Sequence, residues 1–420
     1  MSESIKVLML VRNNLARDSR VRKEAQTVSE MGFDVTVIGV GTKAPEDLAD
    51  APYQLLLTVP YYHGKPLNPK LGRETTWYPI RILVNLTVTA WREWRWHKEI
   101  AKDSSFSASV THPDMESMGL ALVEKPDIVH CHDLDTLWAG YRIAQQRGAL
   151  LVYDSHELYP ALHYLREDDR EQYIRMEPQL FPHLDAFITV SPEIGQKLVQ
   201  QYQSPLEPIV LYNGGKHVVS SVTPVSTPVR LFFQGAFAID RNNVELIDAM
   251  RHLRGKATLT LQGWGQDEDE MRRTIAKYSL EDIVTILPPV PPFEVVDFAN
   301  NYDVGVINSV SIDENFAHTL PNKLFDYMCG GLAIASTSLP PIKKIIDKEH
   351  CGITYEQRGV EHTAKVLEEL VSDPQRIQRM KKASLAAAPY YAWPAQAKKL
   401  TNLYEQLASK VGTASEAKDA

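Results

Sequence analysis

The sequence lacks the features of several protein classes. Only three cysteines occur among its 420 residues, at Cys131, Cys329 and Cys351, and they form no CxxC pair. Such a sparse, odd set is more typical of a reducing compartment than of a disulfide framework. No run approaches the roughly 18 apolar residues of a membrane span, and Met1–Ile5 lacks the basic and apolar stretches of a signal peptide. We therefore expect a cytoplasmic protein.

An excess of positive charge is also absent. The 45 Lys and Arg against 53 Asp and Glu leave a formal net charge of −8, which argues against a nucleic-acid binder that relies on overall positive charge. Hydrophobic residues (44%) and charged residues (23%) stand at ordinary globular levels, which excludes a disordered or collagen-like chain. At roughly 150 residues per domain, the length predicts two or three domains.

Apolar strands that alternate with amphipathic helices organise the chain. Ile5–Val11, Ser19–Met31 and Phe33–Val40 have the patterns of a strand, a helix and a strand, and apolar strands of this kind indicate a parallel sheet covered on both faces. The pattern recurs along the chain. We predict the α/β class, with two tandem doubly wound domains at 1–205 and 206–390 that face a cleft, a helix at 391–410 and a disordered tail at 411–420.

Titratable side chains follow two strands of the first domain. One strand ends in His132 and Asp133, and the next is followed at once by His156 and Glu157. The carboxyl ends of parallel strands share one edge of the sheet, where doubly wound domains bind ligands. Histidine beside carboxylates can orient hydroxyl groups or transfer protons near neutral pH. We therefore predict that these four residues are catalytic, the alternative being loop residues that cap the following helices.

Two further patterns in the first domain leave alternatives open. His130 and His132 alternate onto one face of a strand and could hold a metal, but no Cys or His pair has structural-zinc spacing, so we expect no metal. The first strand is not followed by a GxGxxG dinucleotide fingerprint. Arg17, Arg20 and Arg22 lie there instead, and they could meet an anionic ligand or be solvated surface.

Glycines and an arginine follow the strands of the second domain. Gly235 follows one strand with Arg241 six residues on, and Gly263 ends the next strand. A glycine lets the backbone approach a ligand closely, and an arginine contacts phosphate through two N–H groups. These residues therefore predict a phosphate-binding edge.

A helix start further along the chain supports the same prediction. Thr319 is the expected N-cap and Pro321 lies in the first turn. The free N–H groups of a helix start bind phosphate, and Lys323 adds a full charge there. Asp326 lies over the same face and could accept hydrogen bonds from a ribose. The alternative is an ordinary Lys323–Asp326 pair on a helix surface.

The motifs together resemble the GT-B retaining glycosyltransferases of group 1, also called family 4. The resemblance spans nearly the whole chain. It is strongest in three runs, Asp127-Ile-Val-His-Cys-His-Asp133, Tyr153-Asp-Ser-His-Glu-Leu-Tyr159 and Leu320-Pro-Asn-Lys-Leu-Phe-Asp-Tyr-Met-Cys-Gly-Gly331. It implies two Rossmann-like domains, with a nucleotide-sugar donor in the C-terminal domain and the acceptor mostly on the N-terminal domain.

The resemblance also assigns roles to single residues. It places a basic diphosphate ligand at Arg241, a ribose ligand at Asp326 and a histidine near the reacting sugar at His132. The C-terminal helix, preceded by Trp393, resembles one that crosses back to the N-domain. The full expected donor-binding set is Gly235, Arg241, Gly263, Pro289, Val290, His318, Leu320, Pro321, Asn322, Lys323 and Asp326, where Pro289 and Val290 stand where family members contact the nucleobase.

Three positions depart from the family pattern. The first of the family's paired glutamates is replaced by His318, the arginine after the loop glycine by Ala236, and the Gly-Gly turn after the first strand by Asn13-Asn14. These departures bear on the identity of the donor sugar and on acceptor geometry. A subgroup that also lacks the first glutamate has a similar Leu-Pro-Asn-Lys-Leu-Phe-Asp-Tyr run, so inactivity does not follow.

The predicted function is therefore retaining transfer of a sugar from a nucleotide-diphosphate sugar of UDP or GDP type, without a metal cofactor. The acceptor is a glycan, a lipid-linked saccharide or a small molecule, in cell-surface polysaccharide or glycoconjugate synthesis. Two alternatives are a nucleotide-sugar epimerase of the same fold and a nucleotide-sugar-binding subunit that has lost its chemistry, which His318 and Ala236 suggest.

Four of the seven tryptophans lie between Trp77 and Lys98, together with arginines and an apolar run. Basic and aromatic residues together suit a membrane interface. This segment predicts either peripheral contact with the inner face of the cytoplasmic membrane, as a lipid-linked acceptor would require, or a helix packed on the core.

Overall fold

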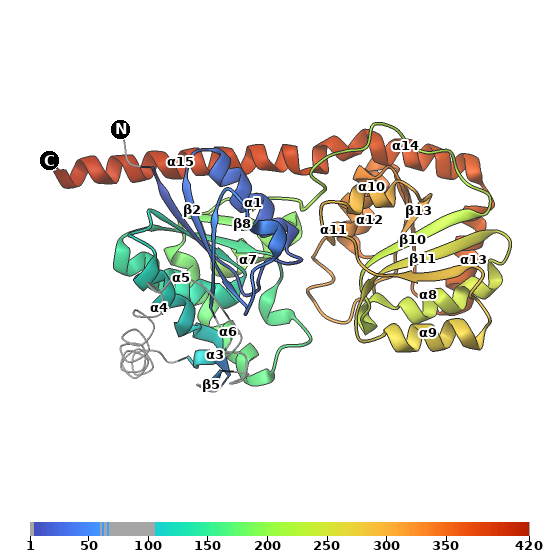
Figure 1. The fold of residues 1–420 in the computed structure, drawn as a ribbon, viewed down its shortest axis with the longest axis horizontal. Coiled ribbons are helices and arrows are strands. Elements are labelled where there is room, and N and C mark those ends of the chain that lie inside the picture. Colours follow the sequence, from blue (N-terminus) through green and yellow to red (C-terminus); the bar gives the residue numbers. More distant parts are fainter. Residues whose placement is uncertain (1–3, 59–60, 63–64, 67–105, 420) are drawn as a thin grey trace.

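The computed structural model describes residues 4–58, 61–62, 65–66 and 106–419, which form two α/β domains side by side (Figure 1). The expected membrane-contacting segment Trp77–Lys98 lies outside the described residues. Among the helices that are described, none is long and apolar enough to cross a membrane.

The N-terminal domain is built on a seven-stranded sheet whose pairings are all parallel, in the order β3-β2-β1-β6-β7-β8-β9. Its strands are β1 Lys6–Leu10, β2 Asp34–Val40, β3 Gln54–Thr58, β6 Ile128–His132, β7 Leu150–Ser155, β8 Ala186–Thr189 and β9 Ile209–Val210. Its helices are α1 Ser19–Glu30, α3 Ala108–Thr111, α4 Pro113–Leu122, α5 Leu134–Arg147, α6 Glu167–Leu180 and α7 Pro192–Tyr202. A separate antiparallel pair joins β4 Tyr61–Tyr62 and β5 Lys65–Pro66.

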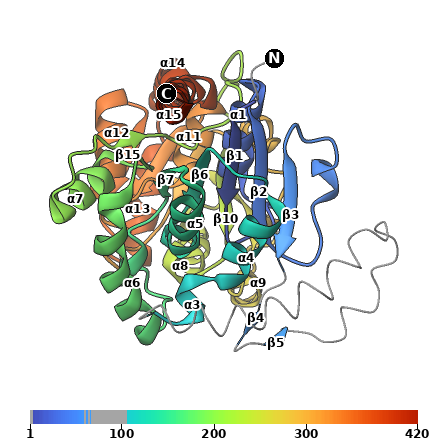
Figure 2. The same ribbon diagram turned by 90° about the vertical axis from the view of Figure 1, so that its left-hand side faces the viewer.

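Helices cover both faces of this sheet because its strands are apolar on both faces. Leu8 and Leu10 of β1 pack into a core beneath α4 and α5, whereas Val7 and Met9 pack into a second core beneath α1 and α15 (Trp393–Asp419). Alternate side chains of a strand point to opposite faces, so one continuous apolar run supplies two cores. Figure 2 shows α1 and α5 on opposite sides of the strands.

The C-terminal domain repeats this architecture with a six-stranded parallel sheet, in the order β12-β11-β10-β13-β14-β15. Its strands are β10 Val229–Ala236, β11 Ala257–Trp264, β12 Val284–Leu287, β13 Val304–Ile307, β14 Ala333–Thr337 and β15 Gly352–Tyr355. Its helices are α8 Asn243–Ala249, α9 Glu268–Lys277, α10 Val295–Ala299, α11 Asn322–Cys329, α12 Pro340–Glu349, α13 Val360–Val371 and α14 Pro374–Tyr391. The strand order reverses between β1 and β6 in one sheet and between β10 and β13 in the other, which is where such sheets bind ligands.

The C-terminal helices tie the two domains together. Tyr391 of α14 packs in the C-terminal core, and the chain turns at Ala392 into α15, which lies along the N-terminal domain (Figure 1). Leu400, Leu403 and Leu407 of α15 pack against the N-terminal sheet, at the spacing of a single helical face.

Two domain limits differ from those expected. β9 pairs with β8, so the N-terminal sheet extends past residue 205. The chain is also helical through Asp419, where the sequence predicts a disordered tail at 411–420. Three of the ten tail residues are alanine, and one each is glutamate and lysine; these residue types have high helix propensity.

Candidate active site between the domains

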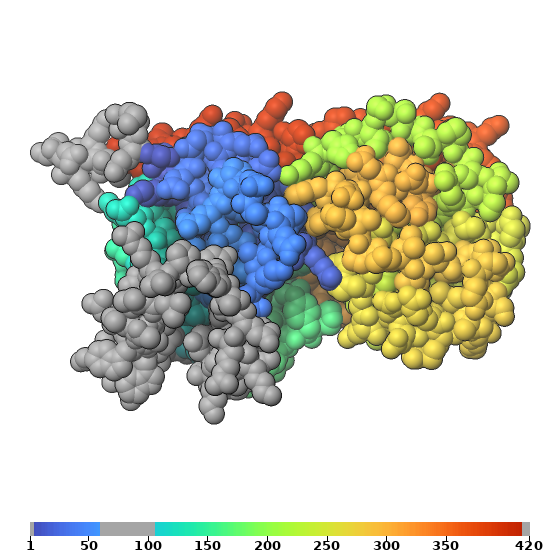
Figure 3. Space-filling view, viewed as in Figure 1, coloured from blue at the N-terminus to red at the C-terminus, as the bar shows by residue number. Residues whose placement is uncertain are grey.

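Loops at the carboxyl ends of the two sheets contact each other where the domains meet (Figure 3). The backbone N–H of Leu158, after β7, donates to Asn315 Oδ1 at 2.9 Å, and that of His163 donates to Asp313 Oδ2 at 3.1 Å. Ser191 Oγ donates to the carbonyl of His318 at 2.6 Å. These contacts bring together the two strand-end groups that the sequence predicts.

Asp154, the penultimate residue of β7, organises the N-terminal side of the site. His156 Nε2 lies 2.9 Å from Asp154 Oδ2, and His132 Nδ1 lies 3.3 Å from the same oxygen. Asp133 accepts from the backbone N–H of His156 at 2.9 Å and lies 3.3 Å from its ring. The structure therefore brings three of the four predicted catalytic residues around one buried carboxylate.

The charges in this group are set by burial and by Arg20. Burial opposes the charge of His156, but Asp133 and Asp154 outweigh it and raise the pKa of His156 well above its usual value, so the ring is an imidazolium at neutral pH. Burial also opposes ionisation of Asp154, but Arg20 and His156 hold its pKa well below its usual value. Arg20 Nη2 and Nε donate to the two oxygens of Asp154 at 2.7 and 2.8 Å.

Glu157, the fourth predicted residue, faces the other domain. Asn315 donates to its carboxylate from the C-terminal domain. Burial and nearby Asp133 raise the pKa of Glu157 to about 7. It is therefore a carboxyl group that can hold or release a proton near neutral pH.

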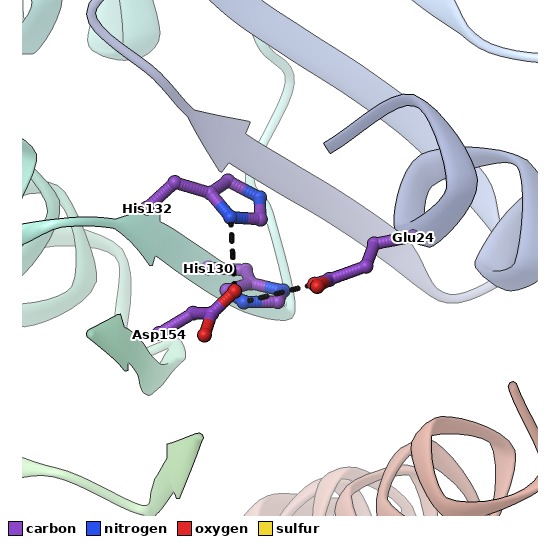
Figure 4. Close-up of side chains that lie close together, drawn as sticks. All are labelled: Glu24, His130, His132 and Asp154. Atoms are coloured by element: carbon purple, nitrogen blue, oxygen red, sulfur yellow. Dashed lines mark ion pairs between the residues drawn. The ribbon is translucent and has the colours of Figure 1, made fainter. Parts of the chain in front are cut away.

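Glu24, His130, His132 and Asp154 form a buried cluster whose ligand-type atoms lie within 4.8 Å of one another (Figure 4). Two histidines and two carboxylates are a donor set that zinc-class ions accept. Arg20, however, already lies 3.0 Å from Glu24 Oε1 and donates to both oxygens of Asp154. A guanidinium thus supplies positive charge to both carboxylates, and a divalent ion would have to enter beside it.

Lys323 dominates the C-terminal side of the site. The side chain is buried in α11, and its Nζ has no hydrogen-bond partner among the described residues. It lies 3.9 Å from the centre of the Phe233 ring and faces Gly235, where a Cβ would come within 3.1 Å of Nζ. Burial and then Arg241 lower the pKa of Lys323 well below its usual value, although Asp240 opposes this fall. An unpaired buried cation beside a second cation is a site for an anion.

The two predicted glycines, Gly235 and Gly263, are required by different structural constraints. Gly235 leaves Lys323 room, and its φ of 137° is unfavourable for other residues. Gly263 lies within β11, where a Cβ would fall 1.8 Å from the carbonyl oxygen of Gly235. Its absent side chain therefore allows two strands to pair closely, so the geometry gives Gly263 a structural reason that needs no ligand.

The remaining donor-side residues lie around these groups. Arg241 Nη1 donates to Ser309 Oγ at 3.4 Å, and His318 Nδ1 lies 2.9 Å from the carbonyl of Glu314. Pro289 and Val290 follow β12, which β11 separates from β10. They share the ligand-binding edge of the sheet, two strands away from Gly235.

Helix α11 begins two residues later than the sequence predicts. Pro321 occupies the N-cap position, so the expected cap at Thr319 is wrong, and Asn322 is the first helical residue. Leu320 is buried just before it. Asp326 is half-buried and interacts with Lys23 of the other domain; burial raises the pKa of Asp326 to about 7, and Lys23 opposes this rise.

The three arginines after β1 do not act as one group. Arg20 is buried against Asp154, and Arg22 pairs with Asp47 at 2.8 Å. The Arg17 guanidinium stacks over Trp264 of the C-terminal domain at 3.7 Å. Arg20 and Arg22 thus have protein carboxylates as partners, whereas Arg17 bridges the domains.

Sequence reasoning missed several groups at this site. Glu24 and Lys23 lie on the same helix as Arg20, and Lys23 Nζ donates to the carbonyl of Gly214 in the interdomain segment at 2.6 Å. Asn315 carries the contact to Glu157. Charged residues on the apolar face of α1 were the available signal, because a buried charge needs a partner. A surface hollow of about 440 Å³ between α1 and α15 contains none of the predicted site residues.

Two family models match the chain. Residues 111–215 match glycosyltransferase family 4, and residues 221–386 match glycosyl transferases group 1. A D-inositol 3-phosphate glycosyltransferase from Thermobispora bispora is 21% identical over 68% of this chain and 72% of its own length.

Solved structures share the fold over nearly the whole length. Sucrose-phosphate synthase from Thermosynechococcus elongatus is 15% identical and aligns with a TM-score of 0.70 over 96% of this chain and 100% of its own. Anabaena Alr3699/HepE in complex with UDP-glucose is 12% identical, with a TM-score of 0.65 over 96% and 100%. The two family models together cover more than half of the chain, and they agree with its two-domain fold: the protein belongs to the GT-B glycosyltransferases of family 4, group 1.

Proposed function

We propose that this glycosyltransferase moves a sugar, with retention of anomeric configuration, from a nucleotide-diphosphate sugar to a hydroxyl of a glycan, a lipid-linked saccharide or a small molecule. Cell-surface polysaccharide or glycoconjugate synthesis is the setting that fits such acceptors. Family membership establishes a glycosyltransferase; the donor class and the retention of configuration are what we propose in addition.

The observation that carries the donor class is the buried side-chain nitrogen of Lys323, which has no hydrogen-bond partner among the described residues. The side chain is buried beside Gly235, where the backbone leaves space, and Arg241 lies close enough to depress its pKa. Two like charges held together in a buried place are costly unless an anion joins them. A diphosphate, with its two charged phosphoryl groups, satisfies both cations.

The same cations serve the reaction. As the sugar–phosphate bond breaks, negative charge grows on the departing diphosphate, and Lys323 and Arg241 stabilise it. Because these cations are already in place at the diphosphate, we propose that no metal ion is needed there. Domain contact through Asn315 and Glu157 excludes the water that would otherwise hydrolyse the donor.

The N-terminal group acts on the acceptor side. His132 is neutral because burial lowers its pKa, and its Nε2 lacks a partner among the described residues, so it can accept a hydrogen bond from a substrate hydroxyl. The His156 imidazolium and the Glu157 carboxyl lie on the same edge. Together they orient hydroxyl groups around the reacting sugar.

Two relatives guide the choice of first substrates. Alr3699/HepE is described in complex with UDP-glucose, and the Thermobispora relative acts on D-inositol 3-phosphate. These names support starting with UDP-sugars as donors and with polyol phosphates among the acceptors. Work at the inner face of the cytoplasmic membrane fits a lipid-linked acceptor and remains part of the proposal.

A thermal-shift screen of UDP, GDP and their sugars against the purified chain tests the donor class. We expect a shift of several degrees with one base and a smaller one with Lys323→Met. Turnover of the best donor, followed by NMR of the product anomer, then separates retaining transfer from inversion and from epimerisation. Binding without turnover across an acceptor panel would favour the non-catalytic subunit.

Lys381 supplies a matched control for that screen. It is also a buried lysine of the C-terminal domain, but it is paired with Asp303 at 3.1 Å. Lys381→Met should lower the melting temperature and leave the ligand-induced shift intact. Loss of the shift in both variants, or in neither, would contradict the assignment of Lys323 to the diphosphate.

A further inference from the structure

A chain of contacts links the C-terminal helix α15 to His132. Tyr404 of α15 lies in the N-terminal core, and its hydroxyl is 2.9 Å from His130 Nδ1. The His130 ring stacks on the His132 ring, with centroids 4.4 Å apart and planes 27° from parallel. All three side chains are at most 1% exposed.

His130 is the stacked neighbour of the His132 ring, and the His156 ring lies further away, with centroids 5.5 Å apart and planes at 53°. Asp154 lies 3.3 Å from His132 Nδ1, a long separation for a hydrogen bond, and neither ring nitrogen has a hydrogen-bond partner among the described residues. The plane of the ring is therefore set by packing, and His130 is the flat surface on which it rests. The orientation of His130 depends in turn on its bond to Tyr404.

We propose that Tyr404, acting through His130, is a positioning residue that holds the His132 ring with Nε2 presented to the substrate. The inference rests on the proposed function for its kinetic consequence, but its structural part does not. It gives the crossing helix a second role besides tying the domains together. A residue 272 positions away in sequence from His132 would then tune the reacting centre.

The groups facing this chain show why the hydroxyl matters. Glu24 Oε2 lies 3.7 Å from His130 Nε2, and Arg20 lies between Glu24 and Asp154. If Tyr404 donates to Nδ1, the proton of His130 lies on Nε2 and faces Glu24. Without the hydroxyl, His130 can adopt the other tautomer or rotate, and the surface beneath His132 changes with it.

Tyr404→Phe tests the proposal, because it removes one oxygen and keeps the ring. We expect kcat to fall about 10-fold, as displacement of a reacting group does, with the donor KM within about twofold. Tyr391→Phe is the matched control: Tyr391 is also buried, its hydroxyl bonds Glu349 at 2.9 Å, and it lies in the core of the other domain. This control should lose similar stability without losing kcat.

A second variant tests whether Tyr404 acts on His132 through His130 or only through a general loss of packing. His130→Phe keeps a flat ring beneath His132 but removes both nitrogens. In that background Tyr404→Phe should cause little further loss of kcat, because the two residues act in series. If the kcat losses of the two substitutions multiply in the double variant, Tyr404 does not act through His130 and the proposal is overturned.

A spectroscopic readout works whether or not the protein transfers a sugar. Long-range 1H–15N spectra of histidine-labelled protein report the tautomer of each ring, with His132 identified by its own substitution. We expect one His132 tautomer in the wild-type protein and in Tyr391→Phe, and shifted or mixed signals in Tyr404→Phe. Unchanged His132 signals would reject the positioning role, even if the proposed transfer were confirmed.

Discussion

The two sheet edges that meet in this protein treat charge in opposite ways. On the N-terminal side, Asp154 accepts hydrogen bonds from Arg20 and from His156. On the C-terminal side, Lys323 is buried over the Phe233 ring with Arg241 and Asp240 nearby, and its Nζ has no hydrogen-bond partner among the described residues. Polar groups that are already hydrogen-bonded to one another hold a fixed geometry before substrate binds. A buried cation without a hydrogen-bond partner gains one only when an anionic ligand binds. Under the proposed function, the N-terminal edge orients the reacting groups and the C-terminal edge captures the diphosphate.

The largest expected effect comes from breaking the satisfied network. Asp154→Asn leaves Arg20 and His156 buried without their carboxylate, and we expect the free energy of unfolding to fall by about 3–5 kcal/mol in urea titrations. Glu46→Gln breaks the ion pair with Lys43, but the side chains of Lys43 and Glu46 are 76% and 86% exposed, so it should leave the free energy of unfolding nearly unchanged. Equal losses would show that the network is not what stabilises this edge.

Removal of the unsatisfied cation should have the reverse pattern. Lys323→Met is expected to lower kcat/KM for the donor about 100-fold, as loss of a single charge-stabilising donor does, while leaving the protein as stable as before or more stable. An unpaired charge costs stability in the free protein. Steady-state kinetics and urea titration measure the two effects. If Lys323→Met instead destabilised the protein and left donor affinity unchanged, Lys323 would have a structural role and not the proposed binding role.

Proton uptake by Lys323 on donor binding is a further difference that we expect between the two sheet edges. Burial holds the pKa of Lys323 well below its usual value in the free protein, and a bound diphosphate favours the ammonium and raises this pKa. Binding should therefore take up as much as about one proton, and affinity should weaken as pH rises through the bound-state pKa. Calorimetry at pH 8 in two buffers of different ionisation enthalpy measures the uptake. Lys323→Met should abolish it, and an unchanged uptake in that variant would place the proton elsewhere.

The smallest expected effect lies where the two edges touch. Arg17→Ala removes the stacking of a guanidinium on Trp264, which we expect to contribute about 0.5–1 kcal/mol to domain closure. The donor KM should rise about two- to fivefold with kcat unchanged. Trp264→Leu should give a similar change, and the double variant should be no worse than either single one. Additive changes would indicate that the two residues act separately.

Much of the fold could be predicted because its signals are local. Helix α1 is found at Ser19–Glu30, close to the Ser19–Met31 that its periodicity predicts. The predictions failed where long-range pairing decides. β9 is only two residues long, and its place depends on pairing with Thr189 and Ile188 rather than on its own pattern. The cap of α11 lies at Pro321 rather than at Thr319, and the intervening Leu320 is buried.

In the candidate site too, local features could be predicted from the sequence and features that depend on long-range contacts could not. Position at a strand end is a local property, so His132, Asp133, His156 and Glu157 could be named in advance, and the structure brings them to one edge. Their charge states could not be named. They depend on Arg20, 134 residues from Asp154 in sequence, and on burial, which raises or lowers a pKa only once the chain has folded.

The sequence by itself determined that this chain forms two doubly wound domains and which polar residues end their strands. Apolar periodicity acts over a few residues and needs no knowledge of the rest. Only the tertiary structure decided which of those residues are paired and which are not. Arg20 and Lys323 look alike in sequence, as cations at the start of a helix. Folding buries Arg20 against two carboxylates and leaves Lys323 without one, because desolvation and pairing are properties of the packed molecule.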